Sequence, residues 1–137
     1  NEKPDVVVDI VDASNLERNL YLTCQFLELG TPLIIALNMV DVAEKRGITI
    51  NTKKLSELLG VPVIPIIARS GQGVDKLFDS VLAVSQKNGH PTTLLRYGSD
   101  IDHALSEIVP IIESHNLLTG TYPSRWIGLK ILENDEQ

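Results

Sequence analysis

The chain has little cysteine and no excess of positive charge. Its single cysteine, Cys24, excludes an internal disulfide framework and a zinc site built from cysteines, and it fits a reducing compartment. Acidic residues outnumber basic ones by 18 to 12, which gives a formal net charge of −6. Because phosphate binding depends on clustered Lys and Arg, this balance argues against a nucleic acid or an anionic membrane surface as the main partner.

Long hydrophobic runs are also absent. The longest, such as residues 61–68, reach eight residues, whereas a membrane-spanning helix requires roughly 20. The first residues contain no hydrophobic signal-peptide core. The chain lacks an initiator Met and enters a strand-like run within a few residues, so we expect it to be a piece of a longer protein.

What is present is the composition of one globular domain. Of the 137 residues, 43% are hydrophobic and 22% are charged, which excludes wholesale disorder. Short β-branched runs alternate with longer amphipathic segments, the pattern of parallel strands joined by helices. We predict strands at 5–11, 33–37 and 61–67, and helices at 16–29, 42–46, 52–59 and 74–87. The fold class is therefore α/β, one half of a three-layer parallel domain.

The pattern changes after residue 90, and no strand is predicted beyond residue 67. We place one unit at residues 1–90 and a small all-helical segment at 91–137. A helix begins near 99–102, and Pro110 should kink it or split it. A last helix begins near residue 122 and should bury Trp126, Leu129 and either Ile131 or Leu132.

The end of the second predicted strand carries the most informative residues. Asn38 follows a buried run, and Asp41 comes three residues later. This edge is where open α/β sheets bind ligands. A carboxylate there can accept hydrogen bonds from N1 and N2 of guanine, whereas adenine would leave it unpaired at a cost of about 1–3 kcal/mol. The alternative is ordinary turn chemistry at a strand end.

The next predicted strand ends in Ala68 and Arg69, followed by a glycine-rich turn about 30 residues beyond Asn38. A small Ala allows a backbone N–H to approach a base oxygen, and the Arg69 stem could lie over the ring. Because consecutive strands share one crevice, this second segment favours a base site over turn chemistry.

Other candidate groups have structural interpretations. We expect Cys24 to be a buried, unreactive thiol on the apolar side of the first helix. Asp9 and Asp12 could suggest a metal pair, but their spacing in a strand places them on opposite faces, and Asp12 is expected to cap a turn or helix. We predict no catalytic residue and no metal site in this chain.

These motifs resemble a known family. Asn38-Met39-Val40-Asp41 resembles the N-[KM]-x-D box of Ras-like GTPases, and Ala68-Arg69-Ser70 resembles their S-A-K-type loop. Residues 11–22 (VDASNLERNLYL) and 27–30 (LELG) resemble the G domain of ferrous iron transport protein B. Residues 122–126 (YPSRW) and 132–135 (LEND) are similar to the helical domain that follows it there.

The resemblance implies guanine-base recognition by Asn38, Met39, Asp41, Ala68 and Arg69. No P-loop G-x-x-x-x-G-K-[ST] occurs in the chain, and phosphoryl transfer depends on that element. We therefore expect GTP or GDP to make base contacts only, with Mg²⁺ held elsewhere in the parent. The resemblance also implies a place at the cytoplasmic face of the cell membrane, with the rest of the transporter as partner.

Two other functions stay open from the residues alone. The chain could be a non-catalytic α/β interaction module without nucleotide, or part of an unrelated doubly wound enzyme whose Asn38 and Asp41 hold a substrate. An exposed flank of the sheet also predicts self-association through that edge.

Overall fold

The computed structural model describes residues 4–86 and 95–133. The chain divides into two compact units, residues 1–93 and 94–137. Within the described residues, none of the helices is both long enough and apolar enough to span a bilayer.

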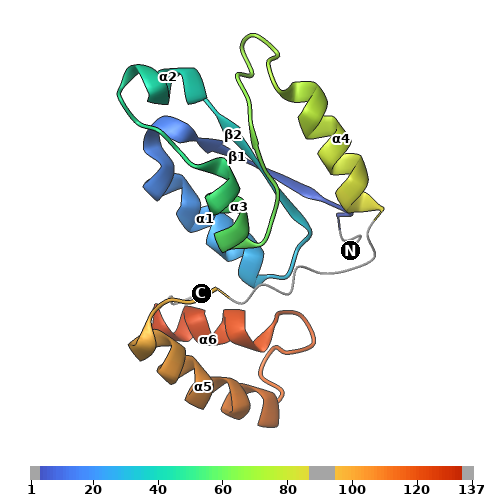
Figure 1. Ribbon diagram of the computed structural model, residues 1–137. Helices are drawn as coiled ribbons and strands as arrows, with labels where there is room; N and C mark the ends of the chain where they lie inside the picture. The colour runs from blue at the N-terminus through green and yellow to red at the C-terminus, as the bar shows by residue number, and fades with distance from the viewer. Residues whose placement is uncertain (1–3, 87–94, 134–137) are drawn as a thin grey trace. The chain divides into compact units, whose positions relative to one another are not determined.

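The first unit is built on a parallel sheet of three strands in the order β1-β2-β3. The strands are β1 (Val7–Asp12), β2 (Leu33–Asn38) and β3 (Val63–Pro65). Central β2 is almost completely buried, as expected of a strand covered on both faces. Figure 1 shows α1 (Leu16–Glu28) and α3 (Thr52–Leu59) on one side of the sheet and α4 (Val74–Ser85) on the other. The predicted parallel α/β class is confirmed.

Local capping explains where several elements begin and end. The 3-10 turn η1 (Ala13–Asn15) begins after Asp12, whose carboxylate accepts a hydrogen bond from the Ser14 N–H at 2.8 Å. Asn51 caps α3 through its side-chain oxygen and the Lys54 N–H, and Gly60 ends that helix in the left-handed conformation. The expected role of Asp12 as a cap is confirmed.

Two predicted strands have different bounds in the structure. The first runs over Val7–Asp12 instead of 5–11, and the third is only Val63–Pro65 instead of 61–67. Pro62 and Pro65 supply no N–H to a ladder, so the β3 pairing is short, and β3 lies at an edge of the described sheet. After Pro65 the Ile66 N–H still donates to the Leu37 carbonyl at 2.8 Å.

Helices α2 and α4 also differ from the pattern. Helix α2 (Val40–Lys45) begins two residues earlier than predicted, directly after Met39. Helix α4 has no buried residue, and Phe78 and Leu82 are 62% and 60% exposed. Residue 87, the predicted end of that helix, and the predicted boundary at residues 90/91 lie outside the described residues.

The second unit packs α5 (Ser99–Ser114) against α6 (Ser124–Leu132). Leu105 and Ile112 of α5 are buried, and α5 continues through Pro110. Of the two expected effects of Pro110, the helix is therefore not split, and the kink stays a prediction. In α6 the buried residues are Ile127, Gly128 and Leu129. A Cβ at Gly128 would lie 3.1 Å from Leu105 Cδ2, so the two helices approach each other closely there.

This close approach corrects the predicted face of the last helix. Ile131 and Leu132 are 53% and 41% exposed, and Trp126 is only half-buried, because the Gly128 side of the helix turns toward α5. Only Leu129 of the predicted set is buried.

Candidate functional site

The site lies at the carboxyl ends of β2 and β3, where Asn38 links two segments. Asn38 is the last residue of β2, and its Oδ1 accepts a hydrogen bond from the backbone N–H of Ala68 at 3.0 Å. The two residues are 30 positions apart in the chain. The amide of Asn38 therefore holds the turn after β3 against the end of β2.

Met39 turns the chain from the strand into α2. Its φ of 62° is in the left-handed region, which is uncommon for a non-glycine residue. Its carbonyl accepts hydrogen bonds from the N–H groups of Val42 and Ala43 at 3.0 and 3.1 Å. The tight turn places Asp41 in the first turn of α2, next to the end of β2.

Asp41 and Arg69 meet across this edge. Arg69 Nη2 lies 3.9 Å from Asp41 Oδ2, with side chains that are 88% and 23% exposed. Such an exposed ion pair contributes little to stability. The Asp41 carboxylate remains accessible from solvent beside Arg69, so it can accept hydrogen bonds from paired N–H groups of a ligand.

The turn after β3, residues 68–71, is ordered by its own backbone. Ile67 and Gln72 form an antiparallel bridge, and the Ile67 N–H donates to the Gln72 carbonyl at 2.9 Å. Gly73 follows the bridge residue Gln72 with φ 81°, and a Cβ there would lie 2.4 Å from the Pro65 carbonyl oxygen. Gly71 and Gly73, two glycines separated by one residue, are the sequence signal for this tight turn.

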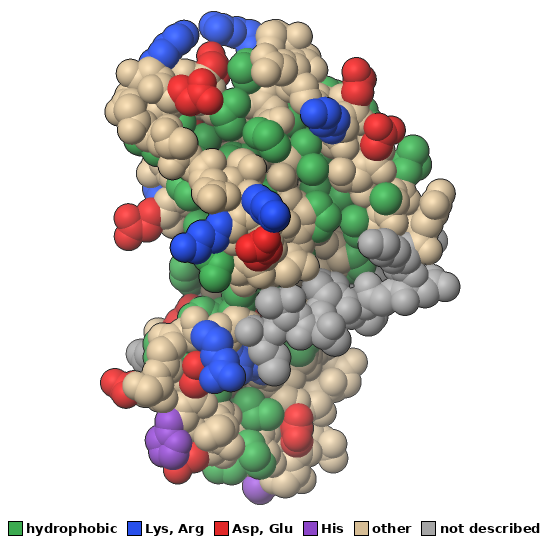
Figure 2. Space-filling view, viewed as in Figure 1, with side chains coloured by type: hydrophobic (Ala, Val, Ile, Leu, Met, Phe, Trp, Pro, Cys, Tyr) green, Lys and Arg blue, Asp and Glu red, His purple; other side chains and the backbone are tan. Residues whose placement is uncertain are grey.

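The five predicted site residues thus fall into two neighbouring segments. The structure brings Asn38 to Ala68 and Asp41 to Arg69 by direct contacts, while Met39 supplies the turn between Asn38 and Asp41. On the face drawn in Figure 2, acidic and basic side chains are interspersed. Among the described residues, no three His, Cys, Asp or Glu side chains form a group that could hold a metal ion.

The surroundings of Asp9 and Cys24, the two other candidate groups, indicate structural roles. The Asp9 carboxylate is buried and accepts a hydrogen bond from Thr23 Oγ1 at 2.5 Å, which ties β1 to α1. Cys24 is half-buried, and burial, followed by the charge of Glu28, raises the pKa of its thiol. A raised pKa lowers the thiolate fraction at neutral pH, which disfavours a nucleophilic role.

The parallel sheet and its helices place the first unit in the class of parallel α/β domains. Domains of this class commonly bind ligands at the carboxyl ends of the strands. Residues 1–81 match the family model described as Ferrous iron transport protein B, and residues 97–137 match the one described as FeoB cytosolic helical domain. The chain belongs to the ferrous iron transport protein B family.

Individual relatives agree with this assignment. The chain is 41% identical over 137 residues to the Fe(2+) transport protein A/Fe(2+) transporter FeoB fusion protein of Porphyromonas gingivalis, covering 98% of this chain and 16% of that protein. It is 42% identical over 132 residues to the Fe(2+) transporter FeoB of Escherichia coli, covering 96% and 16%. The chain thus spans about 16% of the length of these curated relatives.

A solved structure shows the same fold. The mGMPPNP-bound NFeoB from S. thermophilus matches with a TM-score of 0.76 and 36% identity, covering 98% of this chain and 49% of that one.

Proposed function

We propose that this chain supplies guanine-base recognition to the G domain of a ferrous iron transporter. The observation that carries the proposal is the hydrogen bond from the Ala68 N–H to Asn38 Oδ1. It holds the turn carrying Ala68 and Arg69 beside the segment carrying Asp41. A guanine-nucleotide analogue bound to the related NFeoB from S. thermophilus supports the same ligand class.

Each residue has a role in this proposal. Asp41 accepts hydrogen bonds from N1–H and N2–H of guanine. Because the Ala68 N–H is donated to Asn38, the exposed turn offers the backbone N–H of Arg69 to O6. Asn38 orders both segments, Met39 sets the turn, and the Arg69 stem covers one face of the ring. Adenine has no matching donor pair, so it would leave the carboxylate unpaired at a cost of about 1–3 kcal/mol.

The same proposal limits what the chain does alone. Base contacts without a P-loop leave an affinity of millimolar order, about −4 kcal/mol. We therefore infer that this chain by itself neither hydrolyses GTP nor binds it tightly. The phosphates and Mg²⁺ would be held by other parts of the parent protein, because phosphoryl transfer depends on that positioning.

The placement in the parent follows from the family. We infer that residues 1–90 are the C-terminal part of its G domain and that residues 91–137 begin its regulatory helical domain. The matches to 1–81 and 97–137 support this division. The partners are then guanine nucleotide and the remainder of the transporter, at the cytoplasmic face of the cell membrane.

We further propose that the isolated chain self-associates through β1. This strand lies at one edge of the described sheet, and Val8 and Ile10 on it are 36% and 66% exposed. An edge strand that carries exposed hydrophobic side chains pairs readily with another chain.

The base-site assignment is tested by Asp41→Asn in the complete G domain of the parent. An amide can donate to the exocyclic oxygen of xanthine and no longer accepts both guanine N–H bonds, so preference should move from GDP toward XDP by about tenfold or more. Asp79→Asn, an exposed carboxylate on α4, is the matched control. Competition titrations measure the ratio of the GDP and XDP dissociation constants.

An unchanged GDP-to-XDP ratio in Asp41→Asn would remove the base-site assignment. If the unchanged parent domain bound neither GDP nor XDP, the result would instead favour the alternative, an α/β interaction module without nucleotide.

A further inference from the structure

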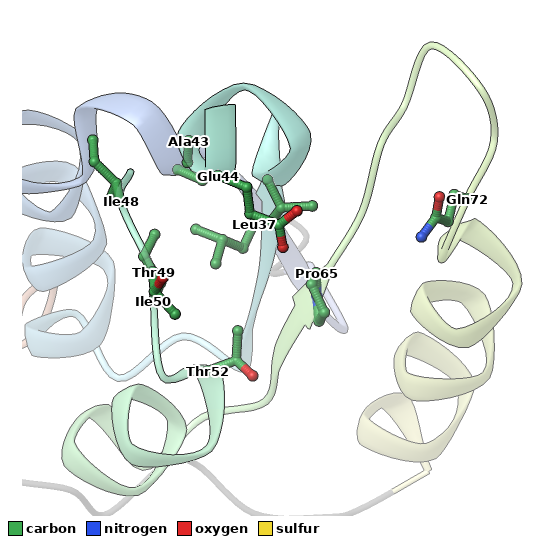
Figure 3. Close-up of a pocket in the computed structure, with 11 residues that line it drawn as sticks. Leu37, Ala43, Glu44, Ile48, Thr49, Ile50, Thr52, Pro65 and Gln72 are labelled. Carbon is green, nitrogen blue, oxygen red and sulfur yellow. The ribbon is translucent and has the colours of Figure 1, made fainter. Parts of the chain in front are cut away.

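A hollow lies next to the proposed base site, on the side of α2 and α3. It has a volume of about 330 Å³ and lies between α2, the segment joining α2 to α3, and the end of β3 (Figure 3). Asn38, Met39, Asp41, Ala68 and Arg69 do not line it. The hollow is therefore separate from the proposed guanine contacts.

Seven of the eleven residues that line it are hydrophobic, and the other four are polar or charged. Leu37 and Ala43 lie beneath its surface, because their side chains are only 0% and 2% exposed. Ile48 and Ile50 stand on one side, with Pro65 of β3 opposite them (Figure 3). The volume is near the lower end of the range of small-molecule pockets, so a short hydrocarbon group fits it better than a drug-sized ligand.

One charged side chain, that of Glu44, lines the hollow. Glu44 is the ionisable residue among those that line the hollow, and its carboxylate extends over Leu37 in Figure 3. Among the described residues, no side chain forms a hydrogen bond or ion pair with this carboxylate. The hydroxyls of Thr49 and Thr52 supply further acceptors along the same wall.

We propose that this hollow binds a small amphipathic cation, namely a primary amine or guanidine carrying a short branched hydrocarbon. The hydrocarbon packs against Ile48, Ile50 and Pro65, and the cation pairs with Glu44. An apolar pocket with few polar groups sets orientation and specificity in this way. A neutral or anionic ligand of the same shape loses the ion pair, so charge complementarity selects the cation.

The hollow and the proposed base site are formed in part by the same elements. Helix α2 contributes Ala43 and Glu44 to the hollow and Asp41 to the base site, while Gln72 lines the hollow from the turn after β3. A bound cation should therefore affect backbone N–H groups of both segments. This binding does not depend on guanine recognition, so either proposal can fail without the other.

The test is an NMR titration of the 137-residue chain with isoamylamine, followed through backbone amide shifts. We expect saturable shifts in α2 and residues 48–52, with a dissociation constant of millimolar order. Isoamyl alcohol, which has the same hydrocarbon without the charge, should bind about threefold to fivefold more weakly. Isovalerate, which reverses the charge, should bind more weakly still.

Two variants separate the contributions. Glu44→Gln should weaken the amine about threefold to fivefold and leave the alcohol unchanged, whereas Ile48→Ala should weaken both ligands. Glu57→Gln, an exposed carboxylate on α3 outside the hollow, is the matched control and should change neither. Shifts spread over the acidic surface, equal binding of alcohol and amine, or equal effects of the two Glu variants would overturn the proposal.

Discussion

At the scale of single residues, buried polar contacts join the sheet to its helices. The Thr23 hydroxyl, 0% exposed on α1, donates to the Asp9 carboxylate on β1 at 2.5 Å. A buried carboxylate that loses its donor bears the full cost of desolvation. This contact therefore fixes how α1 lies on the strand at the sheet edge.

We expect Thr23→Val to lower the free energy of unfolding by about 1–3 kcal/mol, because it leaves the Asp9 carboxylate without this donor. Urea unfolding followed by circular dichroism measures the change. Thr49→Val, at an exposed position, should change it by less than about 0.5 kcal/mol. Equal effects of the two variants would show that the Asp9 contact is not stabilising.

The residues of the proposed base site stand out in the sequence, but the contacts between them do not. Asn38 and Asp41 stand out because polar side chains follow a buried strand. The hydrogen bond from Ala68 to Asn38 joins positions 30 residues apart, and only the strand order brings them together. The same holds for Asp9, whose partner Thr23 lies 14 residues away. The expected stacking of the Arg69 stem on a base stays a prediction.

At the scale of elements, a glycine decides the geometry of the turn after β3. Gly71 and Gly73 both have positive φ, at 78° and 81°. A Cβ at Gly71 would meet nothing within 4 Å, whereas one at Gly73 would meet the Pro65 carbonyl oxygen at 2.4 Å. Only the second position combines backbone strain with a collision against β3.

We expect Gly73→Ala to lower the free energy of unfolding by about 2–4 kcal/mol, because the strand end and the turn must move apart. Gly71→Ala introduces only the backbone strain of a positive φ, so it should lower the free energy of unfolding by about 1 kcal/mol. Denaturant midpoints measure both. A cost at Gly73 no larger than at Gly71 would contradict the close contact with Pro65.

Element bounds were predictable where local chemistry determines them and not where packing does. Asn51 and Gly60 delimit α3 through caps that the sequence displays. The third strand ends early because its prolines withhold N–H groups from the ladder, although its hydrophobicity continues to Ile67. The buried face of α6 follows from the close approach of α5 at Gly128. The spacing of hydrophobic residues in the sequence does not reveal this approach.

At the scale of the whole molecule, the first unit carries exposed hydrophobic side chains on β1 and α4. Ile10, Phe78 and Leu82 are each at least 60% exposed. Large exposed hydrophobic areas commonly mark interaction surfaces. We propose that they contact the remainder of the parent protein and that they favour self-association of the isolated chain.

We expect the isolated chain to form dimers at high concentration and Ile10→Lys to abolish them, because a charge on an edge strand prevents strand pairing. Light scattering after size exclusion gives the mass. Leu58→Lys, at an exposed position on α3, is the control and should leave the mass unchanged. A monomeric mass for the unchanged chain would contradict self-association.

The central claim is that this chain recognises the guanine base without holding the phosphates. The direct measurement is a calorimetric or NMR titration of the chain with guanosine, GDP and adenosine. We expect guanosine and GDP to bind with similar dissociation constants of millimolar order and adenosine to bind at least about tenfold more weakly. Submicromolar binding of GDP, or equal binding of adenosine and guanosine, would contradict the claim.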